Sequence, residues 1–91
     1  MPRFVAIHNF GSGAREVFAQ KGGDMIAVLR ETYPQVVWEG AYIEWATGKA
    51  VCVWDAPDAE SIRKGFARLG IPCDDLYPVE WITPHGLATG G

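Results

Sequence analysis

The sequence of 91 residues has no long hydrophobic run and no cluster of basic residues. Its N-terminal apolar stretch, MPRFVAIHNF, is interrupted at His8 and Asn9, so it is too short for a signal peptide or a membrane span. The formal net charge is −3, whereas affinity for a phosphate backbone requires clustered Lys and Arg side chains. We therefore predict a cytoplasmic protein that binds neither nucleic acid nor membrane.

Cysteine and catalytic motifs are also scarce. Cys52 and Cys73 are too few for a disulfide framework, and in the cytoplasm we expect free thiols, although two cysteines leave a single bridge open. The sequence contains no Cys-x-x-Cys pair and no His-Glu-x-x-His segment. Gly11-Ser12-Gly13 lacks the following Lys of a phosphate-binding loop, which favours an ordinary turn.

The length suits one small domain, which we predict over residues 1–84, followed by a flexible tail at 85–91. Hydrophobic residues make up 48% of the chain and include four tryptophans. A domain of this size leaves a large share of its surface in water, so this apolar content exceeds what one small core absorbs. The composition therefore predicts a homodimer.

Hydrophobic periodicity predicts six elements. Strands are expected at residues 3–10, 36–45, 49–55 and 76–83, and helices at 14–33 and between Asp58 and Gly70. Gly22-Gly23 predicts a break in the first helix, and Pro78 predicts that the last strand lies at a sheet edge. The order is that of the α+β ferredoxin-like βαββαβ fold, with a four-stranded antiparallel sheet and both helices on one face.

Side chains alternate along each strand, which divides the sheet into two faces. We expect the helices to cover the aliphatic set Val5, Ile7, Val51, Val53 and Val79. The open face then carries Phe4, His8, Phe10, Trp38, Tyr42, Glu44, Cys52, Trp54 and Glu80. This second set is too aromatic for an exposed surface, so we expect it to form a ligand-binding or dimer-interface face.

The segment KAVCVWDAPDAESIRKGFARLGIPCDDLYPVEWI, with VVWEGAYIEW before it, resembles a small bacterial ferredoxin-like family typified by a nickel-binding protein. The resemblance covers residues 36–82. It depends on an aromatic-rich hairpin, a strand with Cys, an aromatic residue and an acid, then Ala-Pro-Asp, and a helix that ends in Gly-x-Pro. It implies the fold predicted above and makes nickel or another divalent transition metal a candidate ligand.

His8, Cys52 and Glu80 would lie on consecutive strands of the expected open face. Their nitrogen, sulfur and oxygen donors suit a borderline-soft divalent metal, so this set is the predicted metal site. Packing is the commoner role of a strand cysteine, and a hydrogen-bonded interface position is the commoner role of such a histidine.

Two other function classes stay open at this point. One is a dimeric α/β-barrel enzyme that acts on a small organic substrate with His8 as general acid or base. The other is an RNA-recognition-like module, which the acidic charge disfavours. A small cytoplasmic homodimer that binds a metal or another small ligand is the preferred prediction.

Overall fold

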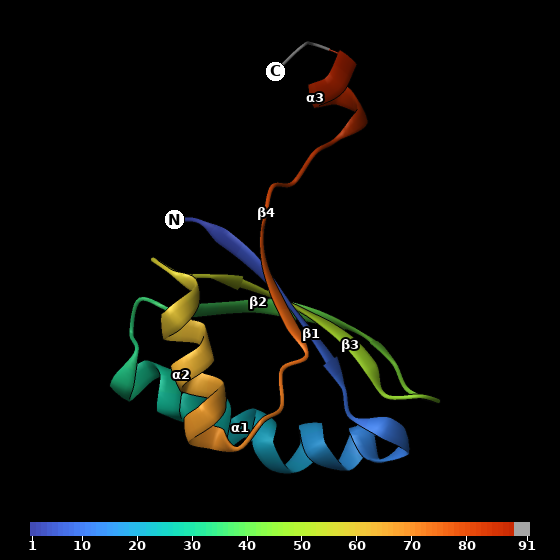
Figure 1. Ribbon diagram of the computed structural model, residues 1–91, viewed down its shortest axis with the longest axis vertical. Coiled ribbons are helices and arrows are strands. Elements are labelled where there is room, and N and C mark those ends of the chain that lie inside the picture. Colours follow the sequence, from blue (N-terminus) through green and yellow to red (C-terminus); the bar gives the residue numbers. More distant parts are fainter. Residues whose placement is uncertain (89–91) are drawn as a thin grey trace.

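Four antiparallel strands form one sheet, and two helices cover one of its faces (Figure 1). The computed structural model describes residues 1–88. The strands are β1 (Arg3–Asn9), β2 (Val37–Glu44), β3 (Lys49–Asp55) and β4 (Asp75–Val79), and their order is β2-β3-β1-β4. A 3₁₀ turn, η1 (Gly11–Gly13), leads into α1 (Ala14–Thr32), α2 (Ala59–Leu69) connects β3 to β4, and α3 (Pro84–Ala88) follows β4. The α+β class, the strand order and the edge position of β4 confirm the sequence prediction.

The core lies between the sheet and the two long helices. On the central strand β1, alternate residues Phe4, Ala6 and His8 are buried, and they pair with Trp54, Cys52 and Ala50 of β3. Four of these six residues, all but His8 and Ala50, form one core cluster with Ile62 and Phe66 of α2 and Leu29 of α1, and the His8 ring meets the edge of Phe66. The core therefore contains the aromatic and sulfur-bearing side chains of the sheet.

The predicted assignment of the two sheet faces was wrong. Val5, Ile7, Val51 and Val53 are half-buried on the face without helices, whereas Trp54 is 1% exposed beneath α2. The space between a sheet and two helices must be filled by side chains, and large aromatic rings fill it better than valine does. Alternation separates the two sets of residues, but it does not say which set the helices cover.

An irregularity in β2 changes the parity of that strand. The pairing passes from Trp38 opposite Trp54 to Gly40 opposite Val53, so Glu39 is an extra residue. Trp38 therefore lies on the covered face, while Tyr42 pairs with Val51 on the open face, where it is 77% exposed. Tyr42, and Glu44 opposite Lys49, keep their predicted face, and Trp38 does not. Phe10 follows β1 and packs against His8 and Phe18, on the covered side.

The helix ends follow local sequence signals, and one predicted break is absent. Asp58 caps α2 by accepting a 2.8 Å hydrogen bond from the Ser61 amide, and Gly70 ends it with φ +66°, as predicted. Helix α1 continues without interruption through Gly22 and Gly23, because packing of its apolar face outweighs the low helix propensity of two glycines. No helix among residues 1–88 is long and apolar enough to cross a membrane.

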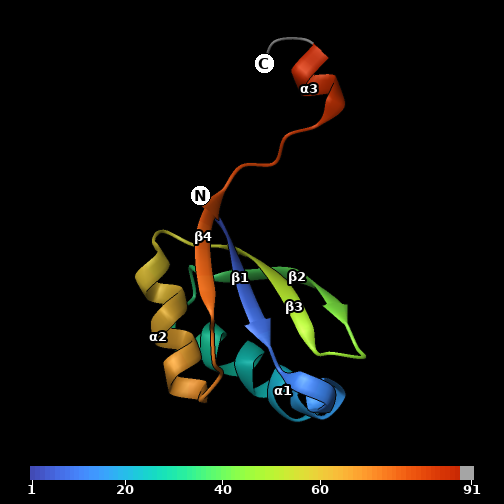
Figure 2. The same cartoon turned by 45° about the vertical axis from the view of Figure 1, so that its right-hand side comes forward.

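Residues 80–88 form a C-terminal arm. Strand β4 ends at Val79, earlier than predicted, and the chain then continues away from both the sheet and the helices (Figure 2). Part of the predicted flexible tail, from His85 to Ala88, lies in α3, and residues 89–91 lie outside the described part of the chain. The arm therefore begins within the segment that the sequence predicted as the end of a strand.

Glycine substitutions in α1 and in the hairpin turn should have opposite effects. A Cβ on Gly23 would meet open space, so Gly23→Ala should raise the free energy of unfolding by about 0.4–1 kcal/mol. Gly48 has φ +79°, and its Cβ would collide with the backbone of Gly11, so Gly48→Ala should lower the free energy of unfolding by more than about 1 kcal/mol. Urea denaturation of both variants measures this, and changes of the same sign would contradict it.

Candidate functional site

His8 is held as a neutral core residue. Its side chain is 1% exposed, and Nδ1 lies 2.6 Å from the carbonyl oxygen of Pro72. A carbonyl only accepts, so Nδ1 carries the hydrogen and donates it. The ring stacks on Phe10 at 5.1 Å and meets the edge of Phe66 at 4.9 Å. Burial lowers the pKa of His8, against the smaller opposing effects of the Pro72 hydrogen bond and Asp74.

Cys52 is equally unsuited to surface chemistry. It is 3% exposed, and burial raises the pKa of its thiol to about 11, so the thiol is protonated at neutral pH. Cys52 pairs with Ala6 and His8 with Ala50, so the two side chains are diagonal neighbours on the covered face. Both cysteines are free thiols, as expected, and Cys73 Sγ donates to the carbonyl oxygen of Asp75 at 3.2 Å. The packing alternative for Cys52 fits this environment.

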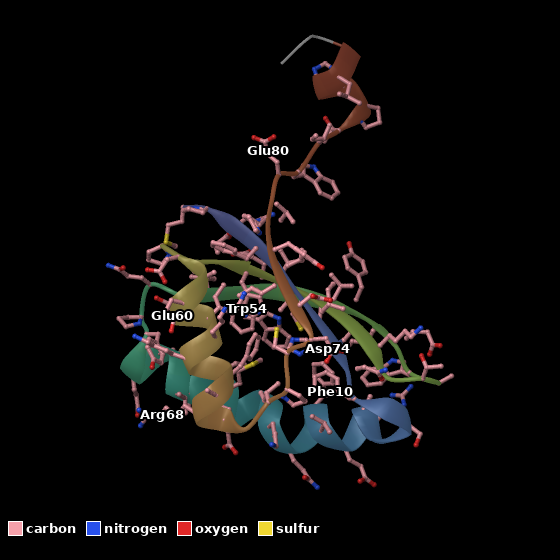
Figure 3. The ribbon with its side chains drawn as sticks, viewed as in Figure 1. Phe10, Trp54, Glu60, Arg68, Asp74 and Glu80 are labelled. Carbon is pink, nitrogen blue, oxygen red and sulfur yellow. The ribbon has the colours of Figure 1, made fainter. Side chains whose placement is uncertain are left out.

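The structure does not bring Glu80 to the other two predicted metal ligands. Phe4 pairs with Pro78, which places Glu80 beyond the opposite end of β1 from His8. Figure 3 shows Glu80 outside the domain on the arm, whereas Trp54 lies between the sheet and α2. Within residues 1–88, no group of three His, Cys, Asp or Glu side chains is placed to hold a metal ion. The structure therefore does not bring the three predicted donors together, because Glu80 lies past the far end of β1 and the other two side chains are on the covered face.

The open face is a second candidate site. Its half-buried aliphatic side chains form what we call the valine face: Val5, Ile7, Val51, Val53 and Val79. Four of the five line a hollow of about 610 Å³, and Tyr42 and Trp81 also line it. A second hollow of about 570 Å³ toward the other end of the strands shares Tyr42 and Val51 with the first. The two hollows make one shallow apolar surface across the sheet.

Charged groups border the larger hollow. Arg3 donates from its guanidinium to both carboxylate oxygens of Asp55, at 2.9 and 3.1 Å. This hydrogen bonding holds the pKa of Asp55 below its usual range. Glu39, the extra residue of β2, and Glu80 of the arm add two carboxylates. An apolar floor with a charged rim suits binding of an apolar or amphipathic surface.

Sequence reasoning missed the valine face, although side-chain volume offered a signal. The predicted covered set contains only Val and Ile, which leave space beneath two helices, while the other set contains Phe, Trp and His. The position of His8 also gives no support to its alternative role as general acid or base, because a catalytic imidazole must reach a substrate.

Comparisons with known proteins agree with this fold. A sequence profile described as "Nickel responsive protein SCO4226-like" matches residues 4–79. The chain is similar to the crystal structure of SCO4226 from Streptomyces coelicolor A3(2), with a TM-score of 0.74 and 22% identity, over 89% of this chain and 99% of that one. A search of curated proteins finds no match. The likeness of the structures shows the fold, and the matched profile ends at the last residue of β4.

Stability should fall in mild acid through His8. Because its pKa in the folded protein lies below the unfolded value, the unfolded chain takes up a proton first as pH falls below about 6.5. The free energy of unfolding should then decrease by at most about 1.4 kcal/mol per pH unit for this group, until the folded pKa is reached. Denaturation of wild type and His8→Gln between pH 7.5 and 5 measures the difference in slope.

Phe10→Leu is the matched control, because it removes a ring that stacks on His8 and keeps the imidazole. It should lower stability at every pH and retain the wild-type slope. A His8→Gln variant with the same slope as wild type would show that His8 is not the group responsible.

Proposed function

The chain belongs to the SCO4226-like family of nickel-responsive proteins, and from this premise we propose that it acts in the cytoplasm as a small homodimeric binding protein in a response to nickel. The observation that supports the proposal most directly is the valine face, an apolar surface on a sheet that has helices on its other side only. The free energy falls when a partner covers such a face and removes its apolar side chains from water.

A second copy of the chain is the proposed partner. Two identical apolar faces are self-complementary under two-fold symmetry, which is the commonest symmetry of small homo-oligomers. Two charged rims would surround the buried centre, which is the usual arrangement at a protein interface. The predicted dimer thus keeps its open-face location but uses the valines in place of Phe4, Trp38 and Trp54.

Nickel binding is assigned to the dimer. The described residues of one copy hold no group of three metal donors. His8 and Cys52 are both buried in the core, and the Cys52 thiol keeps its proton at neutral pH. The carboxylates that line the larger hollow, Glu39 and Glu80, become four when two copies meet. We derive no coordination geometry from them.

Binding is preferred to catalysis. No histidine or cysteine is among the described residues that line the larger hollow. His8 borders the second hollow, but the imidazole that the enzyme hypothesis requires is stacked on Phe10 and packed against the edge of Phe66, on the helix side of the sheet.

Val53→Lys should separate the two copies. Val53 pairs with Val5 at the centre of the sheet, and a lysine there would bury an unpaired charge in the dimer. In a monomer the same side chain can extend into water, so the fold is kept. Light scattering should give twice the chain mass of 10.0 kDa for wild type and a single chain mass for Val53→Lys.

The control is Arg63→Glu, an exposed change on α2 that should leave the dimer intact. A wild-type protein that scatters as a monomer at micromolar concentration would disprove the proposed assembly.

Calorimetric titration with nickel tests the metal assignment. Wild type should bind, and His8→Gln and Cys52→Ser should bind within about twofold of it, because neither side chain reaches the surface. Val53→Lys should bind at least about tenfold more weakly if donors from two copies are required. Equal binding by Val53→Lys would place the site within one copy, and no heat from wild type would disprove nickel binding.

A further inference from the structure

The C-terminal arm carries large apolar side chains outside the domain. The exposed fractions are 78% for Trp81, 60% for Ile82 and 70% for Leu87. Both ribbon views show α3 far from α1, α2 and the sheet (Figure 1 and Figure 2). Burial of such side chains lowers the free energy, and the arm's own domain does not cover them.

The arm ends in the short helix α3, which is too short to be stable without contacts to another surface. Thr83 begins α3 by accepting hydrogen bonds from Gly86 N at its hydroxyl, 3.0 Å, and from Leu87 N at its carbonyl, 3.0 Å. A helix as short as Pro84–Ala88 is not stable alone in water, because the cost of nucleation exceeds the gain from so few hydrogen bonds. An apolar surface from elsewhere would stabilise it.

The arm lies beyond the residues that the family profile matches. The family profile ends at Val79, and the arm begins at Glu80. The sheet, both long helices and the core are complete without it. The core of this domain therefore does not need the arm's apolar residues.

The base of the arm lies at the margin of the valine face. Glu80 and Trp81 line the larger hollow together with Val5, Val53 and Tyr42. A molecule that covers the valine face therefore also meets the arm, and the arm is continuous with the proposed dimer interface.

We propose that each arm crosses to the second copy of the chain and packs on that copy's open face, with Trp81 and Ile82 as its anchors. This inference rests on the proposed homodimer. Two-fold symmetry supplies one arm and one receiving face on each copy, so the exchange is reciprocal and closed.

The area that a stable dimer requires favours this arrangement. A specific interface buries about 800 Å² on each partner. The aliphatic side chains of the valine face are already half-covered by their own sheet. One tryptophan can bury about 150–250 Å², so Trp81 alone supplies roughly a fifth to a third of the requirement.

Truncation after Val79 tests the contribution of the arm to assembly. The dissociation constant of the dimer, measured by sedimentation across a dilution series, should rise by about 10- to 100-fold in the truncated chain. Trp81→Ala should give part of this loss. Trp45→Ala is the matched control, because Trp45 lies near Arg15 and Phe18 of α1 and should leave the constant unchanged.

Fluorescence of Trp81 tests its location. The difference between the emission of wild type and of Trp81→Phe isolates this residue, and acrylamide should quench it weakly in the dimer and strongly in Val53→Lys. A dimer with an unchanged dissociation constant after truncation and a freely quenched Trp81 would overturn the arm exchange and leave the dimer standing. Equal shielding of Trp81 in Val53→Lys would show that the arm packs on its own chain. A monomeric wild type would overturn both proposals.

Discussion

The layer of large side chains between the sheet and its two helices is the constraint on which the other features depend. Trp54 is at its centre, stacked beside Trp38 at 6.1 Å and meeting the edge of Phe66 at 5.3 Å. Within residues 1–88, the buried indole N–H of Trp54 has no hydrogen-bond partner, which costs free energy. The volume and contact area of the two rings offset this cost, because a gap in a packed core also destabilises the fold.

This packing reassigns the polar residues that looked functional in the sequence. On β1, His8 points to the same face as Phe4, and on β3, Cys52 points to the same face as Trp54. Both polar residues therefore lie on the covered face. Beneath the helices their chemistry is suppressed: His8 is neutral with its Nδ1–H given to Pro72, and the thiol of Cys52 keeps its proton. His8 and Cys52 suggest a metal site in the sequence, but in the folded structure they are core residues.

The same packing leaves the aliphatic side of the sheet without a covering layer. Small branched side chains form a flat surface, which suits contact with another flat surface better than it suits a deep catalytic pocket. The arm extends the margin of that surface, because Glu80 and Trp81 line the larger hollow beside the valines. A binding role that depends on assembly fits both features.

The amino-acid sequence by itself determined the element order, the antiparallel topology, the edge position of β4 and the ends of α2. These depend on local signals, such as the Asp58 cap, the left-handed Gly70 and Pro78, which act within a few residues. Only the tertiary structure decided which sheet face the helices cover, where β2 gains Glu39, and that α1 passes through Gly22-Gly23. Each of these depends on how the whole layer of side chains between the sheet and the helices packs. The packing of that layer outweighs the local preference of any single residue.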